Sequence, residues 1–166
     1  MAAQETSVNT VSPHAPWSYV LQLPHDRRAP RVARMTLRAV LAGHGMAELV
    51  DTAELLACEL VTNAYRHSEG LAALRMRAME GNRLRVGVWD TNPEIPAPFD
   101  RPPGALAPLR APAPDASTVD GGRGLLLVQS CADNWGGYRL GDDLFGWRGK
   151  LLWFELASRP EMVRAA

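Results

Sequence analysis

The chain has 166 residues, of which 46% are hydrophobic and 22% are charged, a length and composition typical of one soluble globular domain. Its 18 basic and 18 acidic residues cancel to a net charge of zero, which argues against a general affinity for nucleic acid or anionic membranes. With two cysteines, no apolar run long enough to cross a membrane and no signal-peptide pattern at the N-terminus, we expect a cytoplasmic protein without a disulfide framework.

The first third of the chain predicts one strand and two helices. Alternation of apolar and polar residues indicates a strand over residues 17–23, which Pro24 ends. The stretch after Pro30 predicts a helix over residues 31–45, and a second helix follows over residues 46–67. In the second helix apolar residues recur at three- and four-residue steps, which indicates a face packed against a core.

A β-hairpin is predicted next. Two strand-like runs, residues 71–79 and 83–90, flank the turn residues Glu80-Gly81-Asn82. Alternation places the apolar side chains of both runs on one face and four arginines on the other, at positions 75, 77, 83 and 85. The arginine face is interpreted as a solvated sheet face, with a docking patch as the alternative.

Proline and alanine dominate the stretch after the hairpin. Eight of the 13 prolines lie in residues 93–114, where no apolar period is present. We interpret residues 93–118 as a long surface loop of the kind that often forms a lid over a binding site. A glycine-rich segment then opens an apolar helix over residues 125–133.

Two further strands, over residues 135–140 and 150–156, complete the pattern. The order of strand, two helices, hairpin, loop, helix and two strands predicts an α+β fold. Specifically, we expect a two-layer sandwich: a mixed, mostly antiparallel sheet with its helices on one face. One domain is assigned to residues 17–157, between tails over residues 1–16 and 158–166.

Two polar residues interrupt the apolar pattern of the second helix. At 100° per residue, Glu59 and Asn63 lie one turn apart on the edge of the buried stripe. Desolvating an unpaired carboxylate there is costly unless a cation, a metal ion or ordered water compensates it. The spacing leaves two interpretations open: Glu59 pairs with an arginine while Asn63 caps a loop, or the two residues face a bound ligand.

Asp90 and the segment Gly121-Gly122-Arg123-Gly124 are the other candidates. Asp90 ends a strand with the parity of its core-facing residues, although Asp90-Thr91-Asn92-Pro93 is also an ordinary turn initiator. Glycines at a helix start let backbone N–H groups and the helix dipole attract an anion, and an arginine adds a phosphate-binding fork. The segment does not match a Walker loop. Together with Glu59 and Asn63, these residues predict one nucleotide site.

Three segments resemble a known family. ELLACELVTNAYRHS, VWDTNPEIP and GGRGLLLVQSCADNWG are similar, in that order, to the N, G1 and G2 boxes of the GHKL ATPase superfamily. This superfamily shares the Bergerat fold and includes histidine kinases, gyrase and Hsp90. The short length and the TNA-x-x-H form are most similar to anti-sigma-factor serine kinases and related small actinobacterial regulators. The resemblance spans roughly residues 17–156.

The resemblance implies a role for each candidate residue, with ATP and Mg²⁺ as cofactors. Glu59 would be the general base, Asn63 the Mg²⁺ ligand, and Asp90 the acceptor of the exocyclic amino group of adenine. His67 is expected as a neighbour of the nucleotide rather than a catalyst, and as a histidine satisfied in the core. The boxes imply these further nucleotide-binding residues: Asn92, Gly121, Gly122, Arg123, Gly124 and Leu125.

The activity implied is transfer of the ATP γ-phosphoryl group to a serine or threonine of a partner protein. The implied partners are an anti-sigma-factor antagonist and a sigma factor, exchanged by partner switching, and a second copy of the chain in a homodimer. No direct contact with nucleic acid or a membrane is expected. The alternatives are an ATP-binding module that sequesters a partner without catalysis, a histidine-kinase fragment, and an interaction domain with an inactive pocket.

One departure from the family pattern concerns the G1 box. Its aspartate is usually followed by glycines, as in D-x-G-x-G, whereas Asp90 is followed by Thr91, Asn92 and Pro93. Small actinobacterial relatives commonly have this D-x-x-P form. The floor of the adenine pocket must therefore be built differently in this chain.

Overall fold

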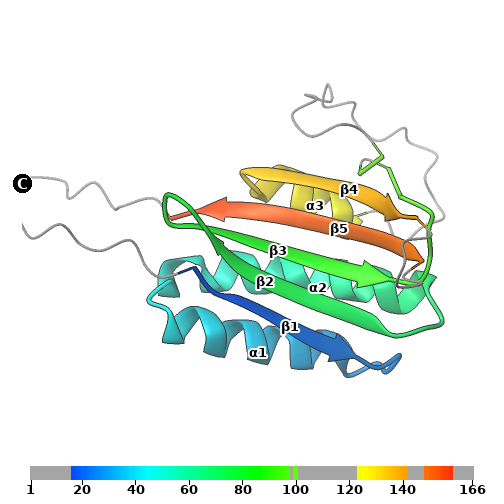
Figure 1. Ribbon diagram of the computed structural model, residues 1–166, viewed down its shortest axis with the longest axis horizontal. Coiled ribbons are helices and arrows are strands. Elements are labelled where there is room, and N and C mark those ends of the chain that lie inside the picture. The colour runs from blue at the N-terminus through cyan, green and yellow to red at the C-terminus, as the bar shows by residue number, and fades with distance from the viewer. Residues whose placement is uncertain (1–15, 98, 101–122, 142–147, 159–166) are drawn as a thin grey trace, which may run out of the picture.

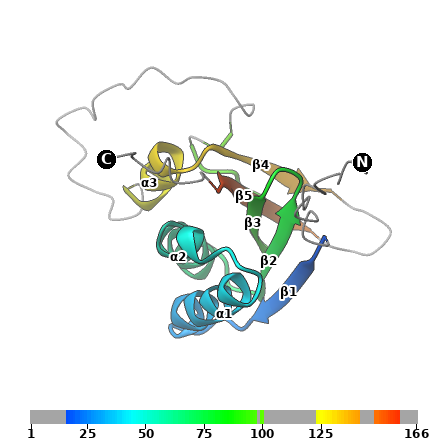
Figure 2. The same ribbon diagram turned by 90° about the vertical axis from the view of Figure 1, so that its left-hand side faces the viewer.

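The computed structural model describes residues 16–97, 99–100, 123–141 and 148–158. Within these ranges the chain forms a five-stranded sheet with three α-helices on one of its faces (Figures 1 and 2). Nearly all of both predicted tails and most of the predicted lid, residues 101–118, lie outside the described ranges. No helix in the described ranges is long and apolar enough to cross a membrane.

Every helix and strand that the sequence predicts is present. In chain order they are β1 (Ser18–Leu23), α1 (Ala29–Gly43), the 3₁₀ turn η1 (Ala47–Leu49), α2 (Val50–His67), β2 (Ala72–Met79), β3 (Arg83–Asp90), α3 (Arg123–Cys131), β4 (Asn134–Leu140) and β5 (Gly149–Ala157). Helix α1 begins earlier than expected because Pro30 lies inside its first turn, where proline's missing N–H costs no hydrogen bond.

The strand order in the sheet is β1-β2-β3-β5-β4. Each neighbouring pair is antiparallel, whereas the sequence predicted a mixed, mostly antiparallel sheet. The last strand in the chain, β5, therefore lies between β3 and β4 and has neighbours on both sides. These features confirm the predicted α+β two-layer sandwich.

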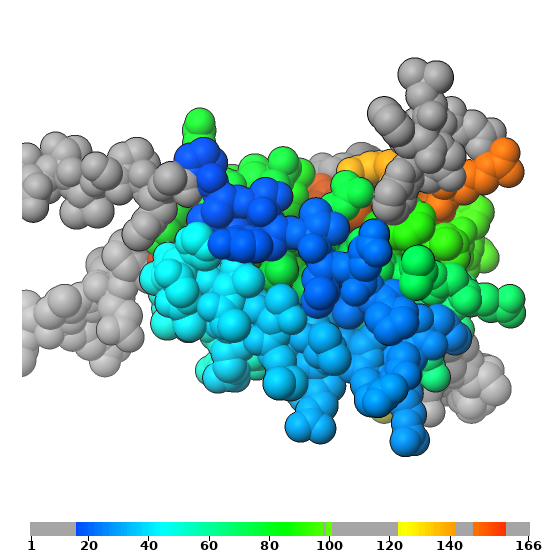
Figure 3. Space-filling view, turned by 60° about the horizontal axis from the view of Figure 1, so that its bottom comes forward, coloured from blue at the N-terminus to red at the C-terminus, as the bar shows by residue number. Residues whose placement is uncertain are grey.

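Strand register brings the apolar residues of neighbouring strands together on the helix-covered face. Leu74 of β2 lies opposite both Leu21 of β1 and Val88 of β3, and Val88 lies opposite Leu152 of β5. The helices cover these side chains with their own apolar stripes, and Leu60 of α2 is 1% exposed. Helix α1 forms the outer surface of this layer, as the space-filling view shows (Figure 3).

The opposite face of the sheet carries the arginines that the alternation predicted. Arg75 and Arg77 are exposed, as expected for a solvated face. Arg83 and Arg85 instead form ion pairs with Glu155 of β5, whose side chain is only 3% exposed. The solvated-face interpretation thus holds for the β2 arginines and only in part for those of β3, whose side chains are 39% and 30% exposed while they pair with Glu155. The sequence alone does not show that β5 brings a carboxylate beside β3.

Candidate functional site

Helix α2 places Glu59 and Asn63 at a pocket that faces the first turn of α3. The Glu59 side chain is half-buried, and no described residue forms an ion pair with it. Asn63 is buried, at 7% exposure. The pocket is lined by Glu59, Thr62, Asn63, Arg66, His67, Gly124 and Leu125. Two segments about 60 residues apart in sequence therefore meet here, as the predicted nucleotide site requires.

Gly124 allows α2 and α3 to approach each other. A Cβ atom at this position would overlap the Glu59 carboxylate and would press on the Glu59 Cβ, 3.2 Å away. The Glu59 carboxylate accordingly lies at the N-terminal end of α3, where the helix dipole favours negative charge. Of the glycine-rich segment, Arg123 is exposed and Leu125 is buried at 3%, whereas Gly121 and Gly122 lie outside the described residues.

Asn63 carries a buried oxygen that lacks a partner. Its Oδ1 accepts no hydrogen bond from any described residue although it is sealed from solvent. Such an atom costs free energy unless a bound ligand supplies the missing interaction. The alternative in which Asn63 caps a loop through this oxygen is therefore not what the structure has, and the oxygen suits a ligand-binding role.

The residues fit a Mg²⁺ ion that is shared with phosphate groups. An amide oxygen is a suitable hard ligand, and Mg²⁺ keeps several waters while binding one or two protein oxygens and substrate phosphates. The described part of the chain has no cluster of three histidine, cysteine, aspartate or glutamate side chains that would hold a metal ion without a substrate. Asn63 is thus the residue that would hold Mg²⁺, together with ATP oxygens.

Asp90 ends β3 on the helix-covered face of the sheet, where it is 1% exposed. Its Oδ1 accepts hydrogen bonds from Lys150 Nζ, at 3.0 Å, and from the Asn92 backbone N–H, at 2.8 Å. The two interpretations of Asp90 are therefore both correct: it is a buried charge and also a turn initiator. Desolvation raises the pKa of Asp90, and the Lys150 ammonium group opposes that rise.

Lys150 reaches Asp90 because β5 starts very close to the end of β3. Gly149 has a φ of 136°, and a Cβ atom there would overlap the backbone carbonyl of Asp90. Both the positive φ and the close approach to the Asp90 carbonyl require a glycine at this position. Lys150 follows immediately, is 1% exposed, and also donates a hydrogen bond to the Asn92 carbonyl oxygen at 3.2 Å.

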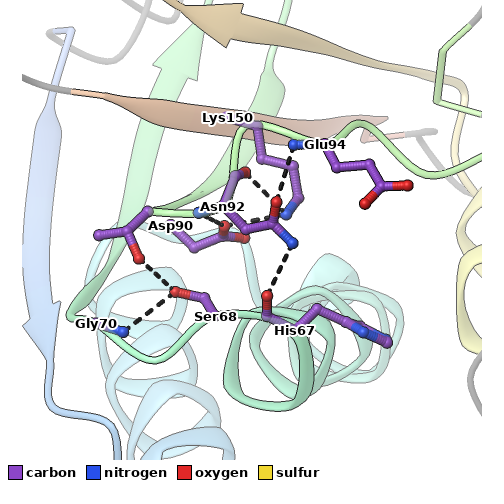
Figure 4. Close-up of polar contacts among 8 residues, drawn as sticks. His67, Ser68, Gly70, Asp90, Asn92, Glu94 and Lys150 are labelled. Carbon is purple, nitrogen blue, oxygen red and sulfur yellow. Dashed lines mark hydrogen bonds and ion pairs between the residues drawn. The ribbon is translucent and has the colours of Figure 1, made fainter.

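The segment after Asp90 is attached to the end of α2 by side-chain hydrogen bonds (Figure 4). Asn92 Nδ2 donates to the carbonyl oxygen of His67 at 2.8 Å, and the hydroxyl groups of Ser68 and Thr91 lie 2.7 Å apart. Asn92 Oδ1 also accepts a hydrogen bond from the Glu94 N–H at 2.9 Å. Polar side chains thus build the segment that glycines form in the usual family pattern, and they connect Asp90 to the helix that carries Asn63.

The expectation for His67 is wrong in one respect. It lines the pocket beside Asn63, as a nucleotide neighbour should, but it is exposed rather than satisfied in the core. Helix α2 ends at His67, and the extended backbone of Ser68 leads the chain away, so the buried stripe of the helix does not continue to this residue.

Sequence reasoning missed three site residues, Thr62, Arg66 and Lys150. Thr62 and Arg66 lie three residues after Glu59 and Asn63, a spacing that places them on the same side of α2. Lys150 shares the parity of Leu152 and the other core-facing residues of β5, and a lysine at such a position requires a buried acceptor. That parity was visible in the sequence, although the identity of the acceptor was not.

Comparison with known proteins gave one family. The sequence model of the histidine kinase-like ATPase domain matches residues 23–144, which is well over half of the chain. The matched region contains Glu59, Asn63, Asp90 and the glycine-rich segment, and it ends before Lys150. A search of curated proteins gave no match.

Proposed function

Because the chain belongs to the histidine kinase-like ATPase domain family, part of the GHKL superfamily, we propose that it is an ATP-binding serine/threonine protein kinase of the anti-sigma-factor type. Family membership supports ATP binding. The pocket that brings Glu59 and Asn63 against Gly124 of α3 is the observation that carries the proposal, because the buried Asn63 Oδ1 has no partner among the described residues. A buried acceptor without a hydrogen bond lowers stability, so a bound ligand that supplies the missing interaction explains why an asparagine is present.

Catalysis would rest on positioning and on charge. Glu59 is the general base: it accepts the proton of a substrate serine or threonine hydroxyl as that oxygen attacks the γ-phosphorus of ATP and ADP leaves. Asn63 and the first turn of α3 hold the phosphate groups, while the Asp90 carboxylate accepts a hydrogen bond from the adenine amino group. Mg²⁺, bound through Asn63, would neutralise charge on the phosphate oxygens. The half-buried position of Glu59 limits competition from water.

The partners follow from the same proposal. The phosphate acceptor is an antagonist protein, and the module sequesters a sigma factor when the antagonist is phosphorylated. Phosphorylation then decides which protein is bound, which regulates transcription by partner switching. A homodimer is the assembly we propose for this exchange.

Substitution of the proposed base tests the catalytic role. We expect Glu59→Gln to abolish phosphate transfer from radiolabelled ATP to a co-purified partner while leaving the affinity for a fluorescent ATP analogue within about threefold of wild type, because the carboxylate is needed for proton transfer and not for binding. Glu54→Gln is the matched control. It removes a carboxylate of the same helix that binds Arg38, with 2.6 Å between Arg38 Nε and Glu54 Oε1.

Two results would change the proposal. If wild-type protein binds ATP with saturation but labels no partner recovered from its native cells, the chain is an ATP-binding module that sequesters partners without catalysis. If it binds no nucleotide at all, the proposal is wrong in both parts and the pocket belongs to an interaction domain.

A further inference from the structure

Lys150 is the only lysine in the chain, and the other 17 basic residues are arginines. Its side chain is 1% exposed and lies on the face of the sheet that the helices cover. A buried ammonium group is costly to desolvate unless acceptors surround it. It has two among the described residues, Asp90 Oδ1 and the Asn92 carbonyl oxygen.

The two carboxylate oxygens of Asp90 differ in their hydrogen bonds. Lys150 Nζ and the Asn92 N–H both donate to Oδ1. No described residue donates a hydrogen bond to Oδ2. The carboxylate is thus anchored through one oxygen, and the other remains as an acceptor.

We propose that Lys150 is a positioning residue that determines nucleobase specificity: it holds Asp90 ionised and anchored through Oδ1, so that Oδ2 can only accept, and the site selects a base with an exocyclic amino group. This inference rests on the proposed ATP site and assigns a role to a residue outside the matched family region.

The protonation state of Asp90 decides which base fits. A carboxylate only accepts hydrogen bonds, so it pairs with the amino group of adenine and repels the carbonyl oxygen of hypoxanthine. A protonated Asp90 could donate to that carbonyl and would lose this selectivity. Discrimination between ATP and ITP is therefore a direct readout of the ionised state that Lys150 maintains.

Loss of Lys150 would make this state depend on pH. Burial already raises the pKa of Asp90, and removing the opposing ammonium group raises it further. Burial favours the neutral form of a carboxyl group, so without the ammonium group Asp90 stays protonated to a higher pH than in wild type. Besides Lys150, His67 of α2 is the charged group that acts on Asp90, and it also lowers the Asp90 pKa; exposed Arg139 of β4 lies opposite Lys150 in the strand register.

The experiment compares wild-type protein with Lys150→Met in titrations of Mg·ATP and Mg·ITP between pH 5.5 and 8.5. For wild type we expect ATP to bind at least about tenfold more tightly than ITP, with little change in ATP affinity above pH 6. For Lys150→Met we expect ATP affinity to fall by about tenfold per pH unit below the raised pKa of Asp90. The ratio of ATP affinity to ITP affinity should decrease over the same pH range.

Lys150→Gln is the second variant, used if Lys150→Met does not fold. It keeps a hydrogen-bond donor but not the charge, so it should show the same pH dependence. Because Lys150 is the only lysine, [¹⁵N]lysine labelling of the wild-type chain gives a single side-chain signal. We expect saturating ATP to shift this signal and ITP at the same concentration to leave it in place.

Three outcomes would overturn the inference while leaving ATP binding intact: equal wild-type affinity for ATP and ITP, a variant whose pH profile and selectivity match wild type, or a variant that binds both nucleotides more tightly at every pH. The last result would mean that Lys150 obstructs the base site. Wild-type protein that binds neither nucleotide would refute the proposed function as well.

Discussion

At the scale of single residues, the site contains groups that fit poorly into a folded interior without a ligand. The Oδ1 atom of Asn63 has no hydrogen-bond partner in the part of the chain that the structure describes, and the ion pair of Asp90 with Lys150 is almost completely desolvated. A buried ion pair of this kind is often no more stabilising than apolar residues of the same volume. Both features lower the stability of the unliganded protein, which is the expected cost of preparing a site in advance for charged ligands.

Substitution of Asn63 should separate stability from binding. In Asn63→Ala the oxygen without a partner is removed, which offsets the lost packing, and alanine is a better helix former by up to about 0.7 kcal/mol. We expect a melting temperature equal to or above that of wild type, together with at least a tenfold loss of Mg·ATP affinity, measured by thermal denaturation and by calorimetric titration.

The control for this substitution is Leu60→Ala, a truncation in the core on the same helix, which is expected to cost about 2–5 kcal/mol of unfolding free energy. If Asn63→Ala is destabilised as much as Leu60→Ala, the side chain packs as an ordinary core residue, and the strain attributed to its oxygen is absent.

At the scale of elements, the apolar period of α2, the strand alternation and the proline and glycine residues at element boundaries together predicted every described α-helix and strand. The same helical period failed at His67, because it does not show where a helix ends relative to the core. The G2-box resemblance placed Gly124 in the site, whereas its reason for being glycine, contact with Glu59, depends on packing between α2 and α3. The Asp90–Lys150 pair was not predicted because it links residues 60 positions apart through strand register.

The contact between α2 and α3 can be tested through Gly124. In Gly124→Ala the new Cβ would overlap the end of the Glu59 side chain, which can move, and would press on its Cβ. We expect a stability loss at the low end of about 1–3 kcal/mol, but a loss of phosphate transfer as complete as in Glu59→Gln, because the carboxylate is displaced from the pocket. Denaturant unfolding and the labelled-ATP assay measure the two effects.

Gly43→Ala is the comparison for this helix–helix contact. Gly43 ends α1, and a Cβ there would meet nothing within 4 Å, so alanine should stabilise the helix by up to about 1 kcal/mol and leave transfer unchanged. Full transfer activity in Gly124→Ala would show that Glu59 does not need its present position.

At the scale of the whole molecule, the carboxylates respond to pH in opposite directions. The bonds from Arg38 hold the pKa of Glu54 below its ordinary value, so this pair stabilises the fold above the unfolded pKa and is lost as the pH falls. The pKa of Asp90 is raised by burial, so the folded state binds its proton more tightly and Asp90 favours unfolding as the pH rises toward that pKa.

We expect Glu54→Gln to lower the unfolding free energy at pH 7 by no more than about 1 kcal/mol, because Arg38 is largely exposed and water screens the pair. The difference from wild type should shrink as the pH falls from 5 to 3, where wild-type Glu54 becomes protonated. Urea unfolding at a series of pH values measures it. A difference that stays constant over that range would mean that the charge of Glu54 contributes nothing to stability.

The position of β5 has a consequence for how the protein is made. The central strand β3 and the edge strand β4 both pair with β5, which leaves the ribosome after all the other described strands. Until it emerges, β3 has an unpaired edge, β4 has no partner among the described strands, and Asp90 lacks the ammonium group of Lys150. Unpaired strand edges make incomplete chains prone to associate. The sheet is therefore completed only when its last described strand emerges, and the same event brings Lys150 to Asp90 at the proposed nucleobase end of the site.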